Sequence, residues 1–296
     1  MEKINIEKMQ EYIGKDSLDE YRNELFNHVY MSKYYPLIKE EGFTDQEIKD
    51  NVTKFNDYVN DLDKASKIKT YEDCVKYQME QRVILHKNPF GRIEKDYVPL
   101  EPYLEHLNYL SSFVVRDFDE SFYKANWMKD IERRVRNFIG NEIKNNNWVY
   151  IAGPIRSGRT YTAIALTNYK YASKGFKIAF LNCPKRFKEL TDAFFKDKAD
   201  FNDMMEEYSN LEYLVLDDFG SEFKNELIRD NIVLPLLKNR LENNKLTIFT
   251  SDFSVREVTK LYSFSRNGED VIATQMARIL ESKISQPFMI NKISVY

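Results

Sequence analysis

One short segment has the glycine spacing that binds phosphate groups in many proteins. After the apolar run WVYIA, the chain fits the pattern G-x-x-x-x-G-K-[ST] at every position except one, where arginine replaces lysine. Glycines let successive backbone N–H groups turn toward one anion, and a helix beginning near the loop's end would add its positive N-terminal dipole. We predict that this segment binds ATP, although a strand–turn–helix without nucleotide fits the loop alone. Its residues are Gly153, Pro154, Ile155, Arg156, Ser157, Gly158, Arg159, Thr160 and Tyr161.

The arginine at position 159 affects the predicted chemistry. Lysine offers a compact ammonium to the terminal phosphates, whereas arginine is larger and forked, so the two are not interchangeable at a tight site. We therefore expect Mg·ATP or Mg·ADP to bind and ATP to be hydrolysed slowly. Replacing Arg159 with lysine should raise the rate.

A pair of carboxylates follows another apolar run, YLVLDD, later in the chain. Such a pair after a buried strand is the Walker B pattern that accompanies a phosphate-binding loop. Asp217 is predicted to hold Mg²⁺ together with the Thr160 hydroxyl, and Asp218 to orient or deprotonate the attacking water. In isolation, a helix cap or a turn would be the simpler interpretation of the two aspartates, and their distance from the phosphate-binding loop favours the functional one.

The elements around these motifs predict an α/β fold. From residue 148, short apolar runs alternate with helical segments, which implies a parallel sheet flanked by helices on both faces. A ligand should then lie at the carboxyl ends of the strands. The predicted strands are WVYIAG, KIAFLNC, YLVLDD, LTIFTS and PFMIN, and the predicted helices are 160–173, 185–196, 200–209, 224–243 and 254–263.

The N-terminal part has a different character. Residues 1–87 are predicted to be helical, with a capping box from Thr44 to Glu47 that opens one helix through residue 59. Residues 88–102 hold three prolines and a glycine and are predicted to be an irregular linker. We therefore expect a mostly helical domain at 1–115 and an ATPase domain at 116–296. The first has 16 Lys+Arg against 22 Asp+Glu, and the rest has 28 against 25.

Four segments, taken in order along the chain, resemble the ATPase domain of the primosomal replicative-helicase loaders (DnaI/DnaC type). They are GPIRSGRTYTAIAL, YLVLDDFGSE, LIRDNIVLPLLKNRLENNKLTIFTSDFS and ATQMARILES. The resemblance covers about residues 116–290 and implies an AAA+ P-loop NTPase that binds ATP and Mg²⁺ and contacts single-stranded DNA. It also implies that the N-terminal domain binds the hexameric replicative helicase. Arg278 matches the family's arginine finger, which reaches the nucleotide of a neighbouring subunit, although a surface helical arginine fits as well.

The resemblance also assigns a role to the run LTIFTSD. In an AAA+ sheet this strand lies between the strands that carry the first two motifs, so its end reaches the γ-phosphate. Asp252 or a neighbour is therefore predicted to be sensor 1. The polar residues 250–252 could instead cap the next helix.

The chain departs from the family at several positions. Arg159 replaces lysine, Asp252 replaces the asparagine of the family's TSN, and Thr274 stands where an arginine is expected. No arginine follows the last predicted strand in INKISVY, and Cys74 with His86 is too few ligands for the zinc site of some relatives. The fold inference is unaffected by these changes, whereas strong ATPase activity does not follow.

The sequence therefore predicts a cytoplasmic primosomal protein that binds ATP and loads the replicative helicase onto DNA, with homo-oligomers on helicase or DNA. A non-hydrolysing AAA+ adaptor and an ATPase partner of a transposase are the alternatives. Neither a signal-peptide pattern nor a membrane-spanning apolar run is present in the sequence. Lys185, Arg186, Phe187 and Lys188 combine cations with an aromatic ring, which suits single-stranded DNA, but an amphipathic helix explains them as well.

Overall fold

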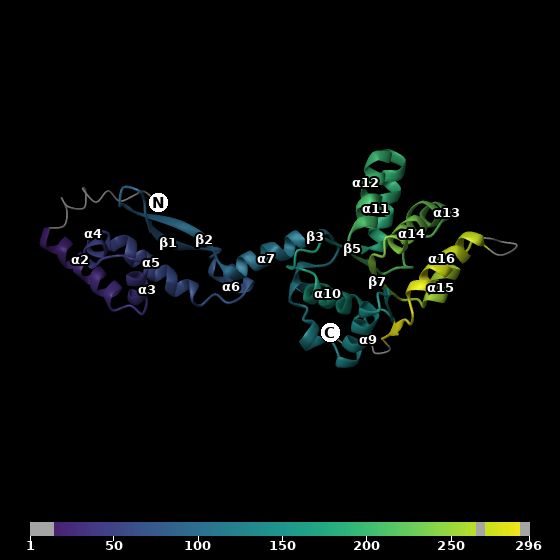
Figure 1. Cartoon of the computed structure of the whole chain (residues 1–296), viewed down its shortest axis with the longest axis horizontal. Helices are drawn as coiled ribbons and strands as arrows, with labels where there is room; N and C mark the ends of the chain where they lie inside the picture. Colours follow the sequence, from purple (N-terminus) through teal and green to yellow (C-terminus); the bar gives the residue numbers. More distant parts are fainter. Residues whose placement is uncertain (1–14, 265–269, 291–296) are drawn as a thin grey trace. The chain divides into compact units, whose positions relative to one another are not determined.

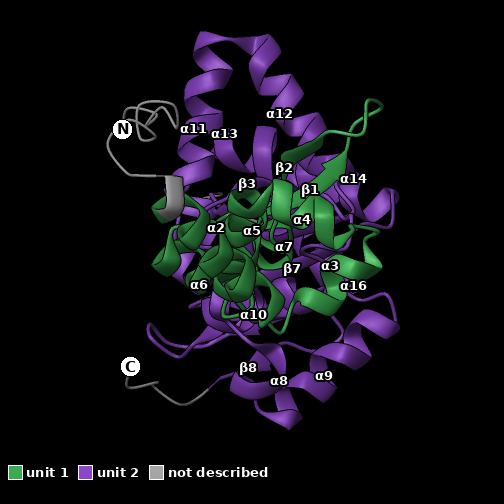
Figure 2. Cartoon of the chain, turned by 90° about the vertical axis from the view of Figure 1, so that its left-hand side faces the viewer, with its two compact units in different colours: residues 1–107 green, residues 108–296 purple. Residues whose placement is uncertain are grey.

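The computed structural model describes residues 15–264 and 270–290. The chain divides into two compact units, residues 1–107 and 108–296, which Figure 2 distinguishes by colour. The division falls within helix α7 (Glu101–Ser112), ahead of the predicted boundary at 115. Residue 115 itself lies in strand β3 (Phe113–Arg116).

The first unit combines short helices with a β-hairpin. Its core is formed by apolar residues of the helices and of the hairpin, including Phe55, Tyr58 and Val83. The predicted capping box is present, because Thr44 accepts from the Glu47 backbone and Glu47 accepts from that of Thr44. The predicted single helix to residue 59 is wrong, since it breaks at Asn51. The helices are α2 (Lys15–Tyr30), α3 (Tyr35–Glu40), α4 (Asp45–Asp50), α5 (Val52–Ala65) and α6 (Tyr71–Tyr77).

The prediction of a helix to residue 87 and an irregular linker at 88–102 is wrong. Strands β1 (Gln81–Lys87) and β2 (Ile93–Pro99) pair antiparallel over their whole length. The Asn88 side chain accepts hydrogen bonds from the backbone N–H groups of Phe90 and Arg92, which closes the turn. The three prolines occupy the turn, the end of β2 and the first turn of α7. All three positions tolerate a missing N–H group.

The second unit contains a parallel six-stranded sheet in the order β3-β5-β6-β7-β4-β8. Figure 1 labels β3, β5 and β7 of this sheet. Strand β7 thus lies, as predicted, between β4, which precedes the glycine loop, and β6, which contains Asp217. Strand β3, at one edge of the sheet, was not predicted. The remaining strands are β4 (Val149–Ala152), β5 (Ile178–Asn182), β6 (Tyr213–Asp217), β7 (Leu246–Ser251) and β8 (Phe288–Met289).

Helices cover both faces of this sheet, because alternate strand residues point to opposite sides. Tyr150 and Leu214 pack on one face with the helices of the later chain, whereas Ile151 and Val215 pack on the other with α9 and α10. The helices are η1 (Glu120–Lys124), α8 (Trp127–Asp130), α9 (Arg133–Lys144), α10 (Arg159–Lys170), α11 (Cys183–Lys196), α12 (Lys198–Asn210), α13 (Glu226–Ile228), the π-helical turn η2 (Arg229–Val233), α14 (Leu234–Glu242), α15 (Val255–Leu261) and α16 (Val271–Lys283).

In the described part of the chain, no helix combines the length and the apolar character that crossing a bilayer requires.

Candidate nucleotide-binding site

The glycine loop connects buried strand β4 to helix α10. A side chain at Gly153 would place its Cβ 2.6 Å from the Ile290 carbonyl oxygen and 2.7 Å from Ser157 Oγ, so only glycine fits. Gly158 has φ +88° and Arg156 has φ +63°, which turns the backbone sharply before α10 begins at Arg159. Such a turn ahead of a helix N-terminus is the backbone geometry that cradles phosphate groups.

The loop also presents a polar group that the protein leaves unpaired. The buried Ser157 Oγ has no hydrogen-bond partner among the described residues. Buried polar atoms are normally paired, so this hydroxyl is a donor that a ligand in the loop could engage. Pro154, Ile155 and Arg156 are exposed, and Ile155 keeps 70% of its surface.

Thr160 and Asp217, the two predicted metal ligands, are in direct contact. The Thr160 hydroxyl donates to Asp217 Oδ1 over 2.8 Å, and the Thr250 hydroxyl donates to the same oxygen over 2.6 Å. Burial raises the pKa of Asp217 to about 6, and the Thr250 hydrogen bond partly opposes this shift. A carboxylate and a hydroxyl on adjacent elements are hard oxygen donors of the kind that Mg²⁺ prefers.

Asp218 lies just beyond the end of β6 with φ +55°, a conformation that non-glycine residues rarely adopt. Its backbone N–H donates to Thr250 Oγ1 over 3.0 Å, which holds the turn against β7. Asn182, at the end of β5, approaches Asp218 Oδ2 at 3.5 Å. The sequence motifs did not point to Asn182. Its position at the end of a strand next to β6 is the signal that could have found it.

Arg159 lies at the centre of this cluster and is nearly buried. Its guanidinium donates to Asp218 Oδ1 over 2.8 Å, to an oxygen of Asp252 and to the Gly153 carbonyl oxygen. Arg159 Nε has no partner among the described residues. Although burial would lower its pKa, the hydrogen bond that Arg159 donates to Asp218 and the charge of Asp252 raise the pKa of Arg159 overall. Three motifs distant in sequence thus meet on one side chain.

Asp252 is therefore brought to the site, as a partner of Arg159. The alternative that residues 250–252 cap the next helix is wrong, because Ser254 caps α15 in a capping box with Glu257. The Thr250 hydroxyl contacts Asp217, and the Ser251 hydroxyl donates to the Phe219 carbonyl. These contacts tie the end of β7 to the end of β6.

Two predicted site residues lie apart from this cluster. The Tyr161 hydroxyl donates to Asp130 over 2.5 Å, so its side chain is directed toward α8. Arg278 is exposed on α16, where no ion pair joins it to another described residue. Its side chain is therefore available to a neighbouring molecule. The segment INKISVY was singled out for its missing arginine, and residues 291–296 of it lie outside the described residues.

Behind the cluster, a buried carboxylate supports the turn after Asp218. Glu222 accepts hydrogen bonds from the Gly220 backbone N–H and from the Tyr262 hydroxyl. Burial raises its pKa, and the Tyr262 hydrogen bond partly opposes the shift. Glu222, to which the sequence motifs assign no role, connects the turn to the end of α15.

The cationic segment at the start of α11 is mostly engaged within the protein. Arg186 and Lys185 both pair with Asp117, whose side chain is only 2% exposed. Burial would raise the pKa of Asp117, but the hydrogen bonds from Arg186 and Lys185 outweigh it and lower the pKa. Phe187 is 1% exposed and belongs to the core, so it is not a stacking surface for bases. Of the four residues of this segment, Lys188 alone is exposed and has no ion pair with a described residue.

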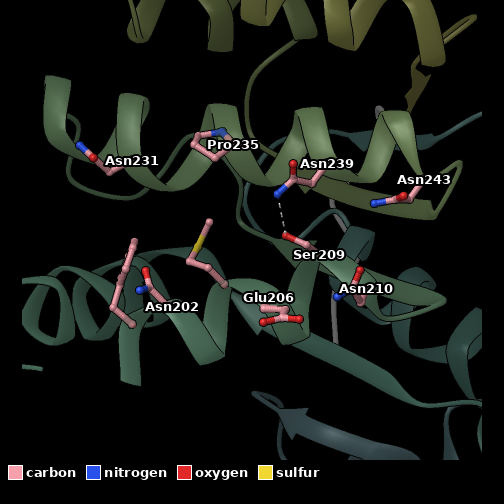
Figure 3. Close-up of a pocket in the computed structure, with 10 residues that line it drawn as sticks. Asn202, Glu206, Ser209, Asn210, Asn231, Pro235, Asn239 and Asn243 are labelled. Atoms are coloured by element: carbon pink, nitrogen blue, oxygen red, sulfur yellow. Dashed lines mark hydrogen bonds between the residues drawn. The ribbon is translucent and has the colours of Figure 1, made fainter. Parts of the chain in front are cut away.

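A separate groove lies between α12 and α14 (Figure 3). Its volume is about 340 Å³, and its walls are mainly neutral amides, with Glu206 as their only charge. Without a cation among its lining residues, the groove does not match a phosphate ligand. The amide residues are Asn202, Asn210, Asn231, Asn239 and Asn243.

Comparison with known proteins places this geometry in context. Residues 106–280, more than half of the chain, match the family model described as IstB-like ATP binding protein. The chain is similar to the replicative helicase loader DnaI of Bacillus subtilis (strain 168), at 26% identity over 141 residues. That match covers 48% of this chain and 44% of DnaI, so the chain spans less than half the length of this relative.

Solved structures show a similar fold. A crystal structure of DnaI matches with a TM-score of 0.50 and 19% identity, covering 64% of this chain and 98% of that one. The DnaC helicase loader matches with a TM-score of 0.45 and 20% identity, covering 58% and 99%. The DnaI match confirms the predicted AAA+ P-loop fold.

Proposed function

Because the chain belongs to the family of IstB-like ATP-binding proteins, we propose that it is a primosomal protein that loads the replicative DNA helicase under the control of bound ATP. The 141-residue match to the DnaI loader carries this proposal. A glycine loop with an acidic pair occurs in many NTPases and would not by itself distinguish a loader from other ATPases.

The residues present fit a nucleotide with Mg²⁺. The backbone of Gly153–Thr160 and the unpaired Ser157 hydroxyl would hold the phosphates, and Thr160 with Asp217 would hold the metal ion. A bound Mg²⁺ would neutralise phosphate charge at this site. Asp218, fixed by Thr250 and Arg159, would orient the attacking water. Arg278 would act on the nucleotide of a neighbouring subunit, which requires an oligomer.

Slow turnover is part of this proposal. Arg159 bonds both Asp218 and Asp252, so the proposed water-orienting carboxylate is held by a cation. A lysine at this position has one ammonium and cannot bridge the two carboxylates with a planar fork. We expect Arg159→Lys to raise the ATPase rate, measured as phosphate release. A wild-type rate equal to that of the variant would contradict this expectation.

We assign helicase binding to the first unit. It carries the chain's excess of negative charge and, among the residues described, contributes none to the nucleotide site. Several large apolar side chains of this unit are exposed, including Phe90 at 87% and Met31 at 81%. Exposed apolar groups on a unit of net negative charge suit a partner surface that is apolar with basic margins. Contact with single-stranded DNA would then fall to the more basic second unit.

The test is capture of the purified hexameric helicase on the immobilised full-length chain. We expect Phe90→Asp to reduce capture at least tenfold, because it removes an exposed ring at the hairpin tip. The control is Phe223→Asp, which changes a 77% exposed ring in the second unit and should leave capture unchanged. Loss of capture only with the Phe223 variant would assign helicase binding to the second unit, and no capture by the wild type would overturn the loader function.

A further inference from the structure

Both terminal nitrogens of Arg159 are already engaged within the chain. One terminal nitrogen bonds Asp252 and the Gly153 carbonyl, the other bonds Asp218, and only Nε lacks a partner. The residue of a phosphate-binding loop that follows the second glycine normally reaches the β- and γ-phosphates. In this arrangement the cation at that position is bound to two carboxylates of its own chain.

We propose that Asp252 competes with the terminal phosphates of ATP for Arg159, so that the phosphates reach this guanidinium by replacing the Asp252 carboxylate. The inference rests on the proposed nucleotide site and specifies how that site is regulated. Asp252 thus lowers the affinity of the site for the nucleotide.

The exposure of the partners shows which side of the pair can move. The Arg159 side chain is 8% exposed and is anchored to the Gly153 carbonyl, whereas the Asp252 side chain is 26% exposed. A carboxylate that loses its partner at this exposure can be hydrated, but a buried guanidinium cannot leave without a replacement anion. A phosphate group is a suitable replacement, because arginine binds carboxylate and phosphate with the same forked geometry.

Simple charge repulsion is the competing explanation for any effect of Asp252 on an anion. The two explanations predict opposite results when Arg159 is removed. If Asp252 only repels phosphate, its effect is larger without Arg159, because nothing neutralises it. If it competes for Arg159, its effect disappears without the guanidinium.

The experiment is a double-mutant cycle on the full-length chain, in which binding of the non-hydrolysable analogue AMPPCP is measured by calorimetry with Mg²⁺. We expect Asp252→Asn to tighten binding about tenfold when Arg159 is present, since a charged hydrogen bond no longer has to be replaced. In the Arg159→Met background the same change should alter the affinity by less than about threefold. A larger gain in the Arg159→Met background would overturn the proposal in favour of repulsion.

Asp203→Asn is the control, because it removes one negative charge from an exposed side chain of α12. Its affinity should equal that of the wild type, and a tenfold gain there would also overturn the proposal. Equal binding by wild type and Asp252→Asn would refute the competition and leave the ATP-controlled loader intact. Absence of binding in all variants would refute the nucleotide site itself, whereas helicase capture reports on the loader function independently.

Discussion

Two buried arginines lie at opposite ends of the same strands and have opposite surroundings. Arg159 lies at the carboxyl ends of β4, β6 and β7, and its partners are two carboxylates and one carbonyl. Arg240 lies at the amino ends of β6 and β7 and is 0% exposed. It bonds the Thr247 hydroxyl and the carbonyls of Tyr208, Leu211 and Leu246, without an acidic partner among the described residues.

The difference separates a cation that stabilises the fold, Arg240, from one whose partners can exchange with a ligand, Arg159. The partners of Arg240 are mostly backbone carbonyls, which cannot move away without unfolding the strand ends, and burial lowers its pKa to about 9. The carboxylates around Arg159 are on side chains that are about a quarter to a third exposed, so they can exchange with an anion from solution. Both residues lie in the segments that resemble helicase loaders, but only one of them is at the predicted site.

The largest expected effect is on stability, from Arg240→Met. The change leaves several buried acceptors unsatisfied, at about 1–3 kcal/mol each, so we expect a loss of about 4 kcal/mol in the free energy of unfolding. Denaturant unfolding followed by tryptophan fluorescence measures it for the second unit alone, because both tryptophans, Trp127 and Trp148, belong to that unit. A loss below about 1 kcal/mol would mean that the carbonyls find other donors.

Arg159→Met should have the opposite effect, with little change in stability and a large loss of nucleotide affinity. Its carboxylate partners can be hydrated, so we expect a stability change of no more than about 1 kcal/mol. The affinity for Mg·ATP should fall by about tenfold or more, because no cation remains at this position to pair with the terminal phosphates. Parallel unfolding and calorimetry of the two methionine variants would test this. An equal loss in the free energy of unfolding for Arg159→Met and Arg240→Met would show that both arginines stabilise the fold to the same degree.

The pH dependence of binding should follow Asp217. Burial raises its pKa to about 6, so below that pH the carboxyl is protonated and no longer available to a metal ion. We expect Mg²⁺-dependent ATP affinity to fall about tenfold per pH unit below 6. The sign for stability is opposite, because a raised pKa means that the folded state favours the protonated form. That contribution is present below about pH 4 and is lost as the pH rises through 6.

Asp217→Asn is the matched control for this pH series. It removes the titrating group and keeps the pH dependence that the nucleotide itself contributes. The difference between the two proteins, measured as Mg²⁺ titrations at pH 5, 6 and 7, isolates the carboxyl. Identical pH profiles would show that Asp217 does not hold the metal ion.

The sequence predicted the parallel sheet and the motif positions because they depend on local patterns. Apolar runs followed by glycine or aspartate identify strand ends, and parallel strands bring those ends together. It could not predict that Arg159 would bond Asp218 and Asp252, because that pairing depends on side-chain directions across three strands. Glu222 and Arg240 were missed for the same reason.

The prolines explain the main failure in the first unit. Prolines at this density predict an irregular linker at 88–102, although the residues before them, QRVILHK, include β-branched apolar side chains suited to a strand. Each proline lies where a hairpin or a helix start accommodates it. Strand β3 was missed because its four residues directly follow α7 without a turn signal.

The smallest expected effect extends the comparison from buried to surface cations. Lys185 already pairs with Asp117, whereas Lys188 is exposed and has no ion pair with a described residue. A cation that is neutralised within the protein releases fewer counterions from DNA, so Lys188→Ala should weaken binding of single-stranded DNA about two- to threefold and Lys185→Ala less. The salt dependence of the affinity should decrease by roughly 0.7 in its slope for Lys188 alone. Fluorescence anisotropy of a labelled oligonucleotide at several salt concentrations measures both quantities. Equal losses for the two lysines would mean that DNA displaces Asp117 from Lys185, as ATP is proposed to displace Asp252 from Arg159.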